Sequence, residues 1–120
     1  MQRFIVTMAL VLASPLGALA GEADIVEVAV FEQQDRRFFV SVAVRHADEG
    51  WKHYADKWDV VAPDGTVLGT RILLHPHDDE QPFTRSLSGV HIPAGTDSVS
   101  LCAHDSVHGY GGAEKRVPLP

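Results

Sequence analysis

Histidines are the residues of this sequence best suited to chemistry. Six of the seven lie at three places along the chain, and these are His46 and His53, His75 and His77, and His104 and His108. Imidazole is the commonest protein ligand for transition metals, and its unperturbed charge changes near neutral pH. The six histidines therefore indicate a metal site or a proton-responsive patch, provided that the fold brings the three places together.

The elements that must position these histidines are β-strands. Apolar and polar residues alternate with period two in seven short segments, which are separated by turn signals such as Pro63-Asp64-Gly65 and Pro93-Ala94-Gly95. The segments are 25–31, 38–44, 54–62, 66–74, 83–92, 99–103 and 117–119. This pattern predicts an all-β fold, an immunoglobulin-like antiparallel β-sandwich of about seven strands.

An up-and-down meander of these strands would place every second connection at the same end. The connections 46–53, 75–82 and 105–113 would then lie together, with the turns at Pro63 and Pro93 at the opposite end. Residues 106–113 carry three glycines and are expected to form a loop. The three histidine-bearing places are therefore predicted to converge.

Each histidine pair has a metal-binding and an ordinary interpretation. His75 and His77 would point to the same side of an extended segment, and acidic residues follow them directly. Asp105 could bind a metal or orient a ligating imidazole. The alternative is that these are hydrogen-bonded surface histidines. The predicted metal ligands are His46, His53 and His108, followed by His75, His77, His104 and Asp105, and they suit copper, iron or zinc.

The first twenty residues have the pattern of a cleavable signal peptide. Arg3 precedes an apolar run from Phe4 to Ala13, and Ala18-Leu19-Ala20 forms an A-x-A cleavage site. The apolar run is shorter than the roughly 20 residues that a membrane span requires. We therefore predict a signal peptide at 1–20, a single domain at 21–120 and export to a periplasm, without membrane attachment after cleavage.

Net charge limits the classes of binding partner, and cysteine content limits the kind of scaffold. Without Arg3 there are nine basic and 16 acidic residues, so the net charge is −7 with neutral histidines. This charge disfavours nucleic acid and anionic membranes as partners. The single Cys102 excludes an internal disulfide, and it is expected to be a small core residue, with a metal ligand or a reactive thiol as alternatives.

Two segments resemble a known family. The stretch from His46 to Val61 resembles the two-histidine loop and following strand of superoxide reductases of the neelaredoxin and desulfoferrodoxin type, and Val107-His108-Gly109-Tyr110 resembles their terminal Cys-x-x-His-Gly motif. The resemblance covers roughly residues 38–110 and implies a similar sandwich. It also implies iron bound by four histidines and one thiolate, and reduction of superoxide to hydrogen peroxide.

The chain departs from that family at two ligands. His46, His53 and His108 match family histidines, but Asp105 stands at the cysteine position, and Cys102 comes three residues too early. The family's first histidine has no counterpart between residues 21 and 45. A carboxylate in place of a soft thiolate changes both redox tuning and metal preference.

Three functions are consistent with the sequence. The first is an exported protein that binds a transition metal through loop histidines, in metal handling or redox chemistry. The second is a mononuclear iron enzyme similar to superoxide reductase. The third is a non-catalytic immunoglobulin-like module whose acidic, histidine-rich end contacts a protein partner in a pH-dependent manner. The sandwich fold alone does not distinguish them.

Overall fold

A computed structural model of the 120-residue chain describes residues 21–120. The predicted signal peptide at 1–20 lies outside the described residues. Within 21–120 all regular elements are strands, so the all-β prediction is confirmed, and no helix there is long and apolar enough to cross a membrane. The strands are β1 (Asp24–Gln34), β2 (Arg37–Arg45), β3 (Ala55–Val61), β4 (Val67–Ile72), β5 (Phe83–His91), β6 (Ser98–Asp105), β7 (Gly109–Tyr110) and β8 (Lys115–Pro118).

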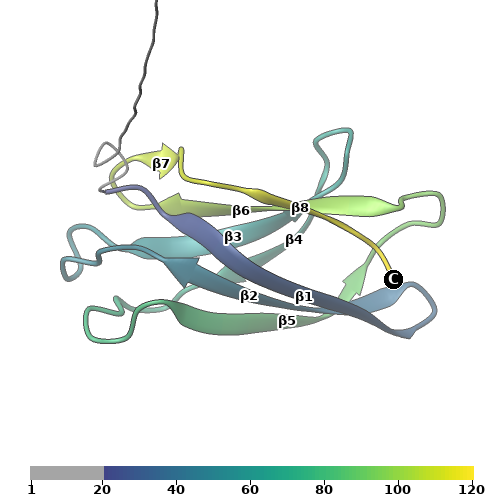
Figure 1. The fold of residues 1–120 in the computed structure, drawn as a ribbon, viewed down its shortest axis with the longest axis horizontal. Coiled ribbons are helices and arrows are strands. Elements are labelled where there is room, and N and C mark those ends of the chain that lie inside the picture. Colours follow the sequence, from purple (N-terminus) through teal and green to yellow (C-terminus); the bar gives the residue numbers. More distant parts are fainter. Residues whose placement is uncertain (1–20) are drawn as a thin grey trace, which may run out of the picture.

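The strands form two antiparallel sheets that face each other, so the predicted sandwich is also confirmed (Figure 1). One sheet has the order β1-β2-β5, and the other has the order β4-β3-β6-β7 with β8 also paired to β6. The structure contains one strand more than predicted. Gly109 and Tyr110 lie in the segment expected to be a loop, but they form β7 because they pair with Asp105 and His104.

The prediction of a meander is wrong. β2 pairs with β5 and β3 pairs with β6, so each sheet contains a pair of neighbours that are distant in sequence. The chain crosses between the sheets after β2, after β4 and after β5. These crossings give each sheet one face to bury against the other, which a single open meander of this length would lack.

The expected convergence of three connections is nevertheless observed. Val44 pairs with Phe83, Ala55 with Asp105, and Lys57 with Ile72. The segments 46–54, 73–82 and 106–108 therefore lie at one end of the sandwich, on the left of Figure 1, beside the beginning of β1. Strand direction still alternates from β1 to β6, and this alternation decides at which end these connections lie, whereas β7 and β8 are both antiparallel to β6.

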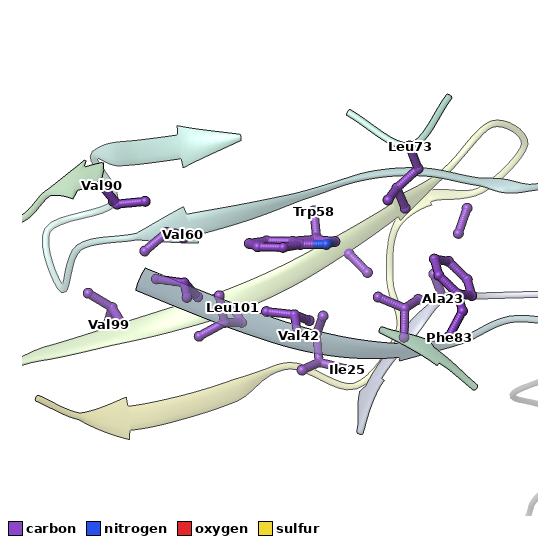
Figure 2. Close-up of a cluster of buried hydrophobic side chains, with 14 of the residues drawn as sticks. Ala23, Ile25, Val42, Trp58, Val60, Leu73, Phe83, Val90, Val99 and Leu101 are labelled. Carbon is purple, nitrogen blue, oxygen red and sulfur yellow. The ribbon is translucent and has the colours of Figure 1, made fainter. Parts of the chain in front are cut away.

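The core extends to the histidine end. Alternate residues of β2 and β6 are buried between the sheets, and Trp58 of β3 lies among them (Figure 2). His46 follows Val42 and Val44 in the inward-facing row of β2, and its exposed fraction is 1%. The packed core thus holds His46 rigidly, although the residue lies beyond the last residue of the strand.

Candidate metal centre

Three side chains from different segments meet at this end. His46 follows β2, His53 precedes β3, and Asp105 ends β6; one ligand atom from each lies within 4.8 Å of the others. His46 Nε2 is 3.6 Å from Asp105 Oδ2, and His53 Nε2 is 3.5 Å from Asp105 Oδ1. Bonds of about 2.0–2.2 Å from one ion place neighbouring ligand atoms about 2.8–3.6 Å apart. The three side chains therefore have the spacing of ligands to one ion.

His108 forms the solvent side of this cluster. Its Nδ1 lies 3.3 Å from Asp105 Oδ1, and its ring centroid is 4.9 Å from that of His53. The side chains of His46 and Asp105 are fully buried, whereas that of His108 is 40% exposed. An ion would reach the buried ligands from the His108 side.

Asp105 is fixed by the main chain but is not satisfied by it. Its Oδ1 accepts hydrogen bonds from the N–H groups of Val107 at 2.8 Å and His108 at 2.6 Å. Its Oδ2 is buried and has no hydrogen-bond donor. Burial acts to raise the pKa of Asp105, but the two main-chain hydrogen bonds and the nearby histidines lower it overall. Asp105 is therefore a buried anion with one oxygen left unsatisfied.

Carboxylates also contact the Nδ1 atoms of His46 and His53, the outer nitrogens of the cluster, which face away from Asp105. His46 Nδ1 contacts Asp48 Oδ1, and His53 Nδ1 lies 2.9 Å from Glu49 Oε1. Asp48 is itself held by the N–H groups of Ala55 at 3.0 Å and His77 at 2.6 Å. A carboxylate behind a ligating histidine orients the ring and fixes its tautomer.

The Nε2 atoms of His46 and His53 face only hydrogen-bond acceptors. His46 Nε2 and His53 Nε2 point to Asp105 and to the carbonyl oxygen of Gly21, at 3.1 Å and 2.9 Å respectively. A neutral imidazole has one N–H, so only one of its two nitrogens can donate. If each N–H is on Nδ1 and is donated to the carboxylate, both Nε2 lone pairs point at oxygen lone pairs, which is unfavourable unless a cation lies between them.

Double protonation is the other way to satisfy these contacts. The hydrogen bond to Glu49 raises the pKa of His53, although burial opposes this shift. However, two imidazolium rings would then lie with their centroids 4.7 Å apart and repel each other. A single metal ion satisfies both Nε2 lone pairs and the unpaired Asp105 oxygen at once, so the donor set fits a cation bound by nitrogen and oxygen.

The structure places His75 and His77 outside this group. His77 is buried against Phe83, with ring centroids 3.9 Å apart, and its Nε2 lies 2.9 Å from an Arg85 nitrogen. Burial, together with the charge of Arg85, lowers the pKa of His77. His75 is exposed, and its Nδ1 lies 3.0 Å from the carbonyl oxygen of Pro76. His77 thus supports the site through its main-chain bond to Asp48, and its side chain binds Arg85.

His104 also lies apart from the cluster. It neighbours Asp105 in β6 and therefore faces the other side of the sheet. There its Nδ1 is 2.6 Å from Asp56 Oδ1, and its ring packs against Tyr110 at 4.8 Å. Of the predicted ligands, His46, His53, Asp105 and His108 are brought together, and His75, His77 and His104 are not.

Sequence reasoning missed the residues that support the ligands. Asp48 and Glu49 lie in the loop between His46 and His53, and their proximity to both histidines was a usable signal. Gln81 connects two loops, because it accepts a hydrogen bond from His46 N–H at 2.9 Å and donates one to the His77 carbonyl at 2.9 Å. Neither this bridge nor the position of Gly21 has a sequence signal.

Cys102 lies outside both the site and the buried core. It is half-buried on the face of β6 opposite Leu101 and Ala103, so its expected place in the core is wrong. Burial, together with the charge and a hydrogen bond of Glu114, raises the pKa of the thiol to about 11. Cys102 therefore does not replace the thiolate ligand of the superoxide reductases.

Comparison with known proteins adds one relative. A protein of Halomicrobium mukohataei named "Putative lipoprotein" is 43% identical to this chain over 91 residues. The match covers 76% of this chain but 44% of the relative, so the chain spans less than half of the relative's length. No known protein family and no solved structure matches the chain. The similarity to superoxide reductases thus remains an expectation from short motifs.

The raised pKa of Cys102 predicts that its thiol reacts slowly with alkylating reagents. At pH 8 a thiol of pKa about 11 has about a hundredfold less thiolate than one at the ordinary value of 9.0. Alkylation of the folded protein by iodoacetamide should be slow at pH 8 and accelerate up to pH 10. Glu114→Gln should increase the rate at pH 8. A native rate at pH 8 equal to that of the urea-unfolded chain would contradict this prediction.

Proposed function

We propose that this protein is exported and binds one divalent transition-metal ion through His46, His53, His108 and Asp105, in metal handling or redox chemistry. One observation carries the proposal: two imidazole nitrogens converge on a buried carboxylate whose Oδ2 has no donor. Such a group of acceptors is stabilised by a cation and is unfavourable without one.

The donor set indicates the class of metal. Three imidazole nitrogens with one carboxylate suit borderline ions such as copper(II), zinc(II) and iron(II), and a hard ion would prefer an all-oxygen site. Zinc accepts this combination in four-coordinate sites, with bonds close to 2 Å. The partly exposed His108 leaves a route for the ion to enter, which a metal-handling protein requires.

Export is supported by two features. The predicted signal peptide at 1–20 ends in an A-x-A cleavage site. The related protein is named as a lipoprotein, and this name also points to an exported protein. We propose a periplasmic location, where the mature domain would meet metal ions outside the cytoplasm.

Metal titration tests this function. Calorimetric titration of the exported protein with Zn(II) and Cu(II), and with Fe(II) under anaerobic conditions, should give one site with a Kd below about 1 µM, that is about 8 kcal/mol of binding free energy. Asp105→Asn and His53→Ala should each weaken binding at least tenfold, because each removes a ligand and leaves the others misaligned.

His91→Ala is the matched control. His91 is exposed at the end of β5 far from the cluster, and the substitution should leave affinity unchanged. Thermal unfolding without metal identifies variants that simply fail to fold. Kd values above 1 µM for all three metals, or equal losses in His91→Ala and His53→Ala, would rule out the proposed site.

Superoxide reduction is the second candidate. The observation that favours it is that His46, His53 and His108, the histidines that match the superoxide reductase motifs, lie together in space. Reduction of superoxide to hydrogen peroxide takes two protons and one electron, which an iron(II) ion held by these residues would supply on becoming iron(III). The site's exposure beside His108 would admit so small an anion.

Peroxide yield tests this candidate. The iron(II)-loaded protein should convert added superoxide to one equivalent of hydrogen peroxide without releasing oxygen, and His53→Ala should lose this activity. The His91→Ala protein, loaded in the same way, should retain it. Superoxide decay at the uncatalysed rate with fully iron-loaded protein would eliminate the candidate and leave metal binding intact.

A further inference from the structure

The carbonyl oxygen of Gly21 lies among the candidate metal ligands. It is 3.1 Å from His46 Nε2 and 2.9 Å from His53 Nε2, the two nitrogens that also face Asp105. Both distances fall within the about 2.8–3.6 Å expected between neighbouring ligands of one ion. The oxygen therefore stands in the same relation to the two imidazoles as the Asp105 carboxylate does.

A Cβ at this position would collide with the cluster, because it would lie 2.7 Å from Cε1 of His108. A side chain would therefore displace either the main chain or an imidazole of the cluster. The close approach brings the Gly21 main chain against three of the four proposed side-chain ligands.

The glycine-rich segment before β8 holds this part of the chain in place. Ile25 N–H donates to the Ala113 carbonyl at 2.8 Å, and Ala113 N–H donates to Asp24 Oδ1 at 2.7 Å. A Cβ on Gly112 would lie 1.9 Å from the Ala23 carbonyl oxygen, so the two segments are in tight main-chain contact. Ala23 and Ile25 are also buried in the core. Contacts of Ala23, Asp24 and Ile25 thus fix the chain just after Gly21.

We propose that the main-chain carbonyl of Gly21 is a further ligand of the metal ion. This inference rests on the proposed function, because it assigns an additional donor to the same site. A neutral carbonyl adds a donor without adding charge, and it joins the three imidazoles and one carboxylate. Since the predicted cleavage follows Ala20, the exported chain would begin at the ligand itself.

Carbonyl NMR tests the assignment directly. Gly21-Glu22 is the one Gly–Glu dipeptide of the sequence, so labelling with 1-¹³C-glycine and ¹⁵N-glutamate gives a single ¹³C–¹⁵N correlation. One equivalent of Zn(II) should shift the Gly21 carbonyl resonance in the native protein. If Zn(II) binds and this resonance does not move, the carbonyl is not a ligand, and the side-chain site still stands. If the native protein binds no Zn(II), both proposals fail.

Affinity gives a second readout. Gly21→Ala should weaken Zn(II) binding about tenfold or more, the usual scale for disturbing metal ligands and their supports. Gly95→Ala is the matched control, because Gly95 has φ +95° but open space around its Cβ position. The control should unfold more readily yet bind Zn(II) with native affinity. Equal affinity in the two variants would overturn the role of Gly21.

Discussion

The interaction on which this end of the molecule depends is that of a buried carboxylate with imidazoles. Asp105 is fully buried, keeps its charge through main-chain hydrogen bonds, and presents one oxygen without a donor. His46 and His53 direct nitrogens at it, and carboxylates behind them hold their outer nitrogens. Without a cation the centre contains too many acceptors, and with one the contacts become mutually favourable.

The sandwich supplies the rigidity that such a centre needs. His46 extends the buried row of β2, and Asp105 ends β6, so two of the proposed ligands stand at the ends of core strands. The loops complete the support, because Asp48 binds the main chain of Ala55 and His77 while Gln81 connects His46 with His77. Ligands on strand ends are held more precisely than ligands on loops alone. In the proposed site the segment 75–82 thus contributes supporting contacts.

Much of this arrangement could be predicted from the sequence. The alternation of apolar and polar residues predicted the sandwich. The alternation of strand direction predicted that the three connections share one end. Pairing between β2 and β5 or β3 and β6 could not be predicted, since it depends on non-local packing. His77 and His104 could not be excluded as ligands for a similar reason: their partners Arg85 and Asp56 are set by tertiary contacts. The contact of Gly21 with the cluster is equally non-local.

Anomalous X-ray diffraction from crystals of the exported protein with one equivalent of Zn(II) tests the central claim most directly. Data collected at the zinc edge should show one strong peak about 2.0–2.2 Å from His46 Nε2, His53 Nε2 and an Asp105 oxygen, with His108 Nδ1 beside it. A peak at His75 and His77, or no ordered zinc in the protein, would contradict this structure-based assignment.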